Sequence, residues 1–561
     1  MSLNPPRWLR IAAVFALHLA ALGLLYQTEY GLYGQTLFAL TWVTLNCVFL
    51  VICRRPGISA ALTLALFSLV VVLSKFKFDV TWMTLGFLDF MIIDADTFAF
   101  LLQIFPDLRT TIFLTAVIGI PGIILIWRFD PFRVSRVMAA ILGIACFQLF
   151  VVMSLAVPEE PTEPFQGVNH VSNVARSGVL AAYELATTGW IETDKTADKL
   201  RIAANETCNP PANNPPAKRP NIILILDEAS FDITAVPGIK VPPGYGEHFK
   251  SIDGKARTFL VEGSGGPTWY TEYNVLTGLS ARSYGRLKFY VTRIAADRVE
   301  RGLPHALRRC GYKTTTLYPA YGAFLSARRF QATAGVERMV DQDEMGARYT
   351  EPDSYYYDRA IRTLDSARGG KPQFVFVYTT ANHFPWYEPV FPERTPGWKA
   401  LGNPDQADEY IRRQVMSAQD YRAFRERLQR EFPGEPFLIV RFGDHQPFIS
   451  HRLLQPGADD KTVASAMASY DPRYFSTYYA IDAINFSPAD LSSALDPLDA
   501  PYLPLVILEA AGLPLDPTFV EQKHILERCK GLFYSCDGGA EARRFNRMLV
   551  DAGLIKGMVS R

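Results

Sequence analysis

Five long apolar segments within the first 157 residues constrain this 561-residue chain more than any other feature. The hydrocarbon core of a bilayer is about 30 Å thick, and a helix needs about 20 apolar residues to cross it. The first segment lacks a small-residue cleavage site, so we expect a retained anchor and not a removed signal peptide. The alternative interpretation is a set of five helices buried in a protein core. The segments are Trp8–Tyr26, Gly34–Cys53, Ile58–Phe76, Thr110–Trp127 and Val137–Val157.

Basic residues around these segments predict how the chain crosses the membrane. Cytoplasmic loops are enriched in Lys and Arg, and with five spans the three arginine clusters all fall on one side. The N-terminus is then cytoplasmic, and everything after residue 157 is outside. Lys75, Lys77 and Arg109 run against this assignment. The clusters are Arg7 with Arg10, Arg54 with Arg55, and Arg128 with Arg133 and Arg136.

A further apolar stretch, Val80–Phe105, carries three carboxylates, Asp89, Asp94 and Asp96. Ionised side chains are costly inside a bilayer, so this stretch is predicted to be a helix at the outer interface and not a sixth span. The alternative is that the carboxylates face a cavity near a bound lipid.

The segment that follows the fifth span is predicted to be a connector. It begins with the run EEPTEP and ends with NPPANNPPAKRP, and such polar, proline-rich runs serve as spacers. Between them, Val171–Ala204 has helical periodicity. The chain therefore divides into a membrane domain (1–157), an extracytoplasmic linker with a juxtamembrane helix (158–220) and a soluble domain (221–561).

Charge and cysteine usage narrow the class of the protein further. A formal net charge of +1 excludes a dedicated nucleic-acid binder, because no strongly basic face is implied. Four of the seven cysteines fall in the soluble part. If that part lies outside the cytoplasm, Cys529 and Cys536 could close a short loop by a disulfide, although spacing does not fix the pairing.

After Pro220 the sequence alternates between strand-like and helical or polar segments. This alternation predicts an α/β/α sandwich with a largely parallel central sheet. A segment at Leu503–Gly512 and the helical tail after it are expected to cover one edge. The predicted strands are Ile222–Leu226, Thr258–Glu262, Thr314–Tyr318, Phe374–Tyr378, Phe437–Phe442 and Phe475–Ala480.

Four short polar stretches follow predicted strands. Because ligand sites in such sheets form at the carboxyl ends of the strands, the four are expected to converge on one rim. They are Asp227 with Glu228 after the first strand, Thr268 in the glycine-rich run GSGGPTWYTEYNVLTG, His383 in TANHFPW, and Asp444 with His445 in RFGDHQP.

The residue types at this rim suit metal-assisted phosphoryl chemistry. Glu228, Asp444 and His445 offer two carboxylates and an imidazole, a set that fits Zn²⁺ or Mn²⁺. A threonine hydroxyl such as that of Thr268 needs a metal or a base to act as a nucleophile, and a glycine-rich turn at a helix start suits a phosphate. His383 could bind a phosphoryl oxygen or protonate a leaving alkoxide. Taken singly, these residues could instead be helix caps or ordinary loop residues.

On these motifs the soluble domain resembles the sulfatase-like branch of the alkaline phosphatase superfamily, and most of all the lipoteichoic acid synthase and phosphoglycerol transferase group. The five-span anchor is similar to the architecture of that group. The matching positions are Asn221 to Glu228, Thr268 followed by Glu272 and Tyr273, His383 with Pro385, and the run of Gly443, Asp444 and His445.

The resemblance implies an alkaline phosphatase-like fold with one divalent metal ion, Mn²⁺ or Zn²⁺ with Mg²⁺ as a further option. It implies Glu228, Thr268, Asp444 and His445 as metal ligands, Thr268 as the nucleophile, and His383 as a catalytic and substrate-binding residue. A family arginine that contacts the substrate phosphate corresponds to Arg328 or Arg329. The implied activity is transfer of a phosphoglycerol-type head group from a phospholipid to a glycan or lipid acceptor through a phosphothreonine intermediate.

Departures from related families leave alternatives open. Sulfatases carry a C/S-x-P-x-R motif, but Trp269 and Tyr270 follow Thr268 here, which argues against sulfate ester hydrolysis. Phosphoethanolamine transferases usually carry several disulfides, and four soluble cysteines allow two at most. The alternatives are a phosphoethanolamine transferase acting on a glycolipid or glycan, a phosphodiester hydrolase, and a non-catalytic membrane sensor. An arginine- and alanine-rich composition favours a bacterial inner membrane with the catalytic domain in the periplasm.

Overall fold

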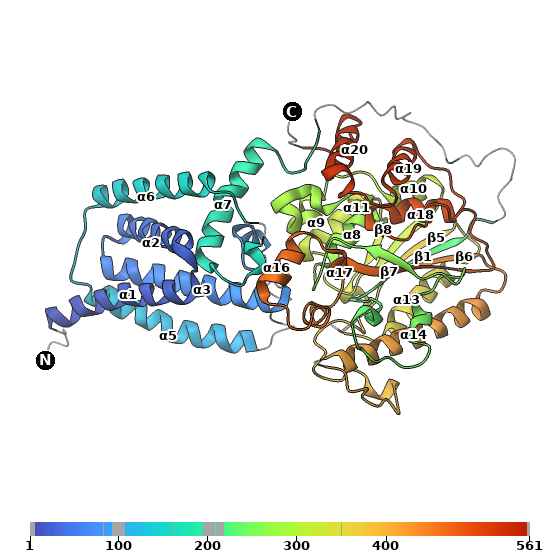
Figure 1. The fold of residues 1–561 in the computed structure, drawn as a ribbon, viewed down its shortest axis with the longest axis horizontal. Coiled ribbons are helices and arrows are strands. Elements are labelled where there is room, and N and C mark those ends of the chain that lie inside the picture. The colour runs from blue at the N-terminus through green and yellow to red at the C-terminus, as the bar shows by residue number, and fades with distance from the viewer. Residues whose placement is uncertain are drawn as a thin grey trace. The chain divides into compact units, whose positions relative to one another are not determined.

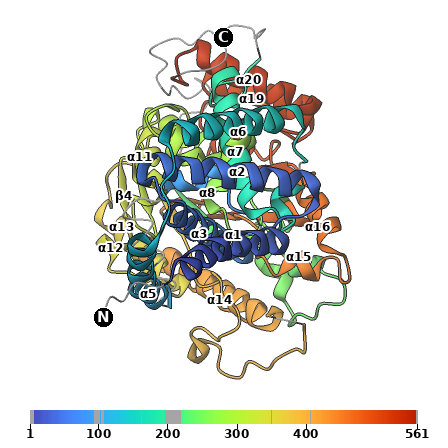
Figure 2. The ribbon, with the colours of Figure 1, turned by 90° about the vertical axis from the view of Figure 1, so that its left-hand side faces the viewer.

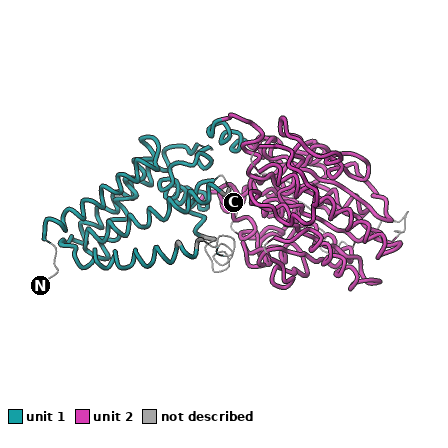
Figure 3. The backbone as a smooth tube through the Cα atoms, turned by 90° about the horizontal axis from the view of Figure 1, so that it is seen from below, with its two compact units in different colours: residues 1–186, 459–469 teal, residues 187–458, 470–561 magenta. Residues whose placement is uncertain are grey.

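The computed structural model describes residues 6–81, 83–92, 102, 107–160, 162–194, 208, 218–348, 350–404 and 406–557. The chain forms two compact units (Figure 3), the first comprising residues 1–186 with 459–469 and the second residues 187–458 with 470–561. Helix α16 (Asp460–Ala468) therefore belongs to the first unit, although the chain on either side of it belongs to the second.

Five helices of the first unit are long and apolar enough to cross a membrane, which confirms the five predicted spans. They pack as a bundle (Figures 1 and 2), and many of their apolar side chains, such as Phe113, Ile118 and Val137, are exposed. Exposed apolar helix faces are unfavourable in water and suit contact with lipid, where a helix satisfies its own backbone polar groups. The helices are α1 (Arg7–Thr28), α2 (Gly31–Cys53), α3 (Pro56–Thr81), α5 (Asp107–Phe129) and α6 (Arg136–Ala156).

The predicted interfacial helix at Val80–Phe105 is only partly described. Its Asp94 and Asp96 lie outside the described residues, whereas Asp89 lies in the short helix η1 (Phe87–Ile92). Lys77 donates to Asp89 Oδ2 over 2.8 Å, so this lysine and this carboxylate neutralise each other.

Helix α7 (His170–Thr187) confirms the helix predicted within Val171–Ala204, and residues 195–204 lie outside the described part of the chain. The carboxylate of Glu29 accepts hydrogen bonds from the backbone N–H groups of Val171 at 3.0 Å and Ser172 at 3.4 Å. A carboxylate in this position satisfies the unpaired N–H groups of the first helical turn.

The second unit contains an eight-stranded sheet in the order β4-β3-β5-β1-β6-β7-β2-β8. Strand β7 runs antiparallel to β6 and β2, and the other neighbouring pairs are parallel, so the predicted largely parallel sheet is confirmed. All six predicted strands are present: β1 (Asn221–Asp227), β2 (Arg257–Leu260), β3 (Lys313–Leu317), β5 (Gln373–Tyr378), β6 (Phe437–Gly443) and β7 (Ser476–Ile484). The other two, β4 (Arg338–Val340) and β8 (Leu498–Asp499), have three and two residues, too few to show a period.

Helices cover both faces of this sheet (Figure 1), which confirms the α/β/α sandwich. Along β1, alternate residues take part in two different cores: Leu224 and Leu226 pack on the side of α8 (Thr268–Thr277), and Ile223 and Ile225 on the side of α13 (Asp353–Ser366) and α14 (Ala407–Glu431). The predicted edge segment forms α18 (Leu503–Ala510), which packs against α8 in the first core. It belongs to the helical layer, because its apolar residues are buried on all sides.

Shorter helices complete the second unit. They are α9 (Val291–Ala295), α10 (Leu303–Arg309), α11 (Ala327–Thr333), α12 (Gln342–Met345), α15 (Ser450–Leu453), α17 (Pro472–Phe475), α19 (Pro517–Cys529) and α20 (Ala540–Asp551), with the 3₁₀ segments η5 (Ala281–Tyr290) and η6 (Phe324–Ser326) among the described ones. Disulfides join Cys208 to Cys310 and Cys529 to Cys536, so the predicted short loop is closed.

Candidate metal and nucleophile site

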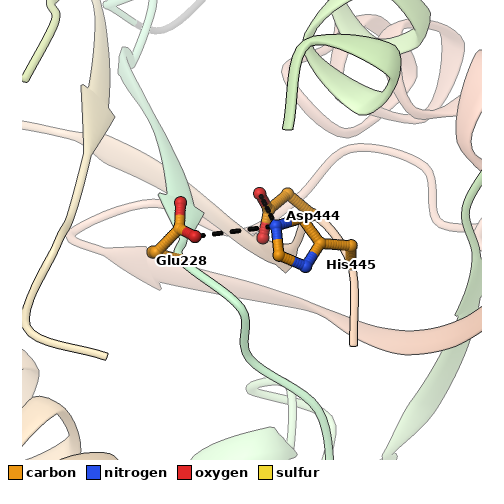
Figure 4. A group of neighbouring side chains, drawn as sticks. All are labelled: Glu228, Asp444 and His445. Carbon is orange, nitrogen blue, oxygen red and sulfur yellow. Dashed lines mark ion pairs between the residues drawn. The ribbon is translucent and has the colours of Figure 1, made fainter. Parts of the chain in front are cut away.

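Strand β1 ends in two carboxylates that belong to opposite faces of the sheet. By the alternation of the strand, Asp227 lies on the face of Ile225 and Glu228 on the face of Leu226. Figure 4 shows Glu228 beside Asp444 and His445, which follow the carboxyl end of the neighbouring strand β6. The predicted convergence of these three residues is therefore present in the structure.

The three side chains form a compact, buried group. Their potential ligand atoms lie within 4.8 Å of one another, and none of the three residues is more than 7% exposed. His445 Nε2 lies 3.3 Å from Asp444 Oδ2 and 3.6 Å from Glu228 Oε1. Two carboxylates and one imidazole nitrogen thus point at a common position.

Hydrogen bonds around this group fix the direction of its ligand atoms. His445 Nδ1 lies 2.9 Å from the carbonyl of Gln446, which assigns the ring proton to Nδ1 and leaves a lone pair on Nε2. Asp444 Oδ1 accepts from the N–H of Ala229 over 2.8 Å, and within the described residues the buried Oδ2 has no hydrogen-bond partner. Three potential ligand atoms therefore face a common position, and a cation there would stabilise this arrangement.

Burial acts on the carboxylates in the same sense. Burial, followed by the charges of Asp444, Asp227 and Asp353, raises the pKa of Glu228 well above its usual range. Burial also raises the pKa of Asp444. Both carboxylates are thus disfavoured in their ionised form until positive charge is supplied, and the group fits a divalent metal ion by its donor set, its burial and the orphaned Asp444 Oδ2.

Thr268 lies at the first position of α8 and is partly exposed. Its Oγ1 is 3.4 Å from His445 Nε2, so the predicted nucleophile lies beside the metal-ligand group. The turn before it is tied to the metal loop, because the N–H of Gly265 donates to the carbonyl of Gln446 over 3.0 Å. Gly265 has a φ of +78°, and an added Cβ would meet the His451 ring at 3.3 Å. Glycine is therefore required at this point of the turn.

His451 was not predicted from the sequence, yet it supports the nucleophile turn. Its Nε2 lies 2.8 Å from the hydroxyl of Ser264, and both side chains are buried. The two residues are 187 positions apart in the sequence. No motif around His451 indicates that it would contact the nucleophile turn.

His383 is held on its own loop after β5. Its Nδ1 lies 2.9 Å from the Phe384 carbonyl, and Arg413 donates to the carbonyls of His383 and Pro385, each at 2.7 Å. Arg413 is fully buried and was also not predicted, because it lies within the charged helix α14, far along the chain. Burial chiefly, with the charges of His445 and Arg413, lowers the pKa of His383 to about 4. His383 is therefore neutral at physiological pH.

The other face of the sheet carries a buried ion network around Asp227. Asp227 Oδ2 lies 3.0 Å from His248 Nε2 and accepts from the Tyr478 hydroxyl over 2.6 Å. Arg441 contacts His248 at 3.3 Å and donates to Asp482 over 3.4 Å. Burial alone would raise the pKa of Asp227, but the hydrogen bonds from His248 and Tyr478 and the charge of Arg441 hold it below its usual value.

The two arginines suggested for phosphate binding are engaged elsewhere in the structure. Arg328 pairs with Asp341 at 2.6 Å and Glu344 at 2.7 Å and donates to the Met339 carbonyl. The guanidinium of Arg329 is 70% exposed and pairs with Asp297. Both guanidinium groups thus have carboxylate partners of their own in the structure.

A mainly parallel sheet between helical layers, with a threonine beside a metal-ligand group at the carboxyl rim, defines a sulfatase-type domain. Residues 257–468 match the family model described as Sulfatase, a range that contains Thr268, His383, Asp444 and His445 and begins after Glu228. The second unit thus contains a Sulfatase-family domain over these residues. Among curated protein sequences, none matches the chain.

Three solved structures resemble the chain at low sequence identity. The integral membrane lipooligosaccharide phosphoethanolamine transferase A (EptA) of Neisseria meningitidis has a TM-score of 0.50 and 11% identity, and the match covers 85% of this chain and 95% of that one. The phosphoglycerol transferase GacH of Streptococcus pyogenes has a TM-score of 0.46 and 15% identity, and the match covers 60% of this chain and 85% of that one. The lipoteichoic acid synthase LtaP of Listeria monocytogenes has a TM-score of 0.42 and 16% identity, and the match covers 54% of this chain and 74% of that one. At 11% identity the likeness to EptA concerns the fold, and a coverage of 85% of this chain exceeds the second unit and so extends into the first.

Proposed function

We propose that the protein is a membrane phosphotransferase that moves a phosphoglycerol-type head group from a phospholipid to an extracytoplasmic glycan or lipid acceptor. The observation that carries this proposal is the position of Thr268 Oγ1, 3.4 Å from His445 Nε2 and at the start of helix α8. A helix start offers unpaired N–H groups to a phosphate, and the five apolar helices would keep the site near its lipid donor.

In the first step, the Thr268 hydroxyl attacks the phosphorus of the donor phosphodiester and loses its proton. The bond from phosphorus to the diacylglycerol oxygen breaks, and that oxygen leaves as an alcohol after taking up a proton. A phosphothreonine ester of the head group remains. Because phosphoryl transfer depends mostly on positioning and charge neutralisation, the fixed nucleophile turn is the main contribution of the chain.

In the second step, an acceptor hydroxyl attacks the same phosphorus and the bond from phosphorus to Thr268 Oγ1 breaks. That oxygen takes up a proton, which restores the threonine hydroxyl. His383 is suited to receive the acceptor proton, since its Nδ1–H is used by the Phe384 carbonyl and Nε2 then carries a lone pair. This differs from protonation of the leaving alkoxide, which would need a proton on Nε2.

Glu228, Asp444 and His445, with Thr268, would hold one divalent metal ion, Mn²⁺ or Zn²⁺ with Mg²⁺ as a further option. Such an ion would supply Lewis acidity, lowering the pKa of the Thr268 hydroxyl and neutralising charge on the phosphoryl oxygens. The two disulfides of the second unit support an oxidising compartment outside the cytoplasm, such as the periplasm of a bacterium, with the first unit in the inner membrane.

Intact mass spectrometry after incubation with phosphatidylglycerol or, separately, phosphatidylethanolamine tests this proposal. We expect an adduct of one glycerophosphate group on the peptide that contains Thr268, and none in Thr268→Ala. An ethanolamine phosphate adduct would instead support the related phosphoethanolamine activity. Metal-loaded, folded protein that forms no adduct and releases no diacylglycerol would contradict the enzymatic proposal and favour a sensor.

A further inference from the structure

A group of partly exposed aromatic side chains includes the residue that follows the nucleophile in the sequence. The ring of Trp269, the residue after Thr268, packs edge-on against Phe289 at 5.0 Å and Phe324 at 6.2 Å between centroids. All three are partly exposed, whereas most large apolar side chains of this unit are buried. Trp269, Phe289 and Phe324 together form an aromatic ledge.

The ledge offers little to a polar ligand. Trp269 carries its single N–H group, and this donates to the Phe289 carbonyl over 2.8 Å. A sugar ring requires several hydrogen-bond partners around its edge, which the ledge side chains lack. An apolar ligand requires only surface that can be removed from water.

The segment that carries Phe324 adopts an unusual backbone conformation. Leu325 and Ser326 have φ values of +47° and +60°, two consecutive non-glycine residues in the left-handed region. The turn is tied down because Thr292 Oγ1 donates to the Leu325 carbonyl over 3.0 Å. Arg328 anchors the chain just after the turn through the Met339 carbonyl and Asp341. Backbone strain of this kind persists where the surroundings enforce it and is concentrated at ligand-binding sites.

The residue before Phe289 in the sequence carries a positive charge. Lys288 donates from Nζ to the Tyr470 hydroxyl over 2.7 Å and lies 5.1 Å from the centre of that ring. A lysine in this segment favours an anionic phosphodiester over a ligand that offers only an ammonium group.

We propose that the aromatic ledge binds the glycerol backbone and the acyl chains of a phospholipid, with the lipid phosphate towards Thr268. This inference rests on the proposed function, since it identifies the apolar part of the same donor. Each methylene buried on the ledge is worth about fourfold in affinity. A longer acyl chain should therefore bind more tightly until it extends beyond the rings.

The test uses binding without turnover. The full chain with Thr268→Ala, purified in an amphipathic polymer, is titrated with dihexanoyl and dioctanoyl phosphatidylglycerol below their micellar concentrations, and with glycerol phosphate as the head-group fragment. We expect the dioctanoyl lipid to bind at least about tenfold more tightly than the dihexanoyl lipid. Phe289→Ala and Phe324→Ala should each reduce this ratio at least threefold and leave glycerol phosphate binding unchanged.

Two control variants separate the proposal from general damage. Phe324→Leu keeps an apolar side chain and should retain most of the chain-length effect. Phe486→Ala removes a partly exposed aromatic that follows strand β7 and should retain all of it. Because β7 is antiparallel to β6, its end lies at the rim opposite the carboxyl ends of the parallel strands.

The outcomes distinguish this inference from the proposed function. An unchanged chain-length ratio in both ledge variants would overturn the ledge, even if the phosphothreonine adduct forms. A chain-length effect that the ledge variants abolish would support the ledge, even if no adduct forms. Loss of glycerol phosphate binding in the ledge variants would assign the rings to the head group and overturn the inference.

Discussion

Substituting Asp444 by Asn should separate the role of its charge from the role of its shape. Asn preserves the volume of the side chain and can keep Oδ1 as the acceptor for the Ala229 N–H, a contact of 2.8 Å in the structure. The other arm then becomes an NH₂ group that faces His445 Nε2, where the carboxylate oxygen lies at 3.3 Å. The variant thus loses an anionic ligand atom and gains donors aimed at a second ligand.

Metal affinity should fall strongly as a result. Residues that only support metal ligands typically cost 10- to 100-fold in affinity when replaced, so loss of a ligand is expected to cost at least about 100-fold, or about 2.7 kcal/mol. Isothermal titration calorimetry of the purified full chain with Mn²⁺ and with Zn²⁺ measures this quantity directly.

Stability of the metal-free protein should change in the opposite direction. Two like charges within the 4.8 Å span of the group repel by about 3 kcal/mol at an effective dielectric constant near 20. Because the raised pKa of Glu228 allows a proton to relieve part of this repulsion, the expected gain is about 1–2 kcal/mol, a few degrees in apparent melting temperature. Thermal unfolding in EDTA and in excess metal should therefore rank the variant above the wild type in the first condition and below it in the second.

A matched control is Asp365→Asn, which removes a carboxylate that is 63% exposed and paired with Arg368 on the surface. It should alter neither metal affinity nor the response to EDTA. Metal affinity of Asp444→Asn within threefold of the wild type, or a metal-free variant that melts below the wild type, would refute this account of the site.

Three further outcomes are expected. Thr268→Ser should keep measurable transfer and move the adduct to the new hydroxyl, whereas Thr268→Val should abolish the adduct with metal content retained; peptide mapping and metal analysis check both. Burial, and then the charge of Asp227, raises the pKa of Asp353 to about 8. The folded protein therefore keeps a proton on Asp353 that the unfolded chain releases above about pH 4. The free energy of unfolding should then fall as the pH rises from about 4 to about 8. Asp353→Asn should reduce the pH dependence of the free energy of unfolding by up to about 1.4 kcal/mol per pH unit. Denaturant unfolding between pH 5 and 8 measures this change. Arg413→Met leaves the carbonyls of His383 and Pro385 without their donor, and it should destabilise the fold by about 3 kcal/mol or more and reduce transfer while metal affinity stays near that of the wild type.

The parts of the site that could be predicted from sequence are those at strand ends. Glu228 and His445 follow apolar runs long enough to be recognised as strands, and the rule that sites form at the carboxyl ends of such strands then places them together. Thr268 could be predicted because glycine and proline mark the turn before it. Each of these signals is local in the sequence.

Residues that support the site from a distance could not be predicted. Arg413 reaches the His383 carbonyl across 30 residues, and His451 reaches Ser264 across 187. Neither lies in a recognisable pattern, because a buried arginine inside a charged helix has the same sequence surroundings as an exposed one. The suggestion of Arg328 was drawn from a segment with no strand end to fix its register, and the structure places that guanidinium in ion pairs with Asp341 and Glu344.

The adjacent carboxylates Asp227 and Glu228 show how the sheet separates a structural charge from a charge kept for a ligand. Asp227 meets His248, Tyr478 and, through them, Arg441, and its pKa is held down. One residue later the strand has reversed its face, and the charges that act on Glu228 are those of carboxylates, which together with burial raise its pKa. Once Glu228 and Asp444 have both lost their protons, the group offers two negative charges to a ligand. A divalent cation balances that charge, which is why metal binding should release a proton and become tighter as pH rises through the raised pKa of Glu228.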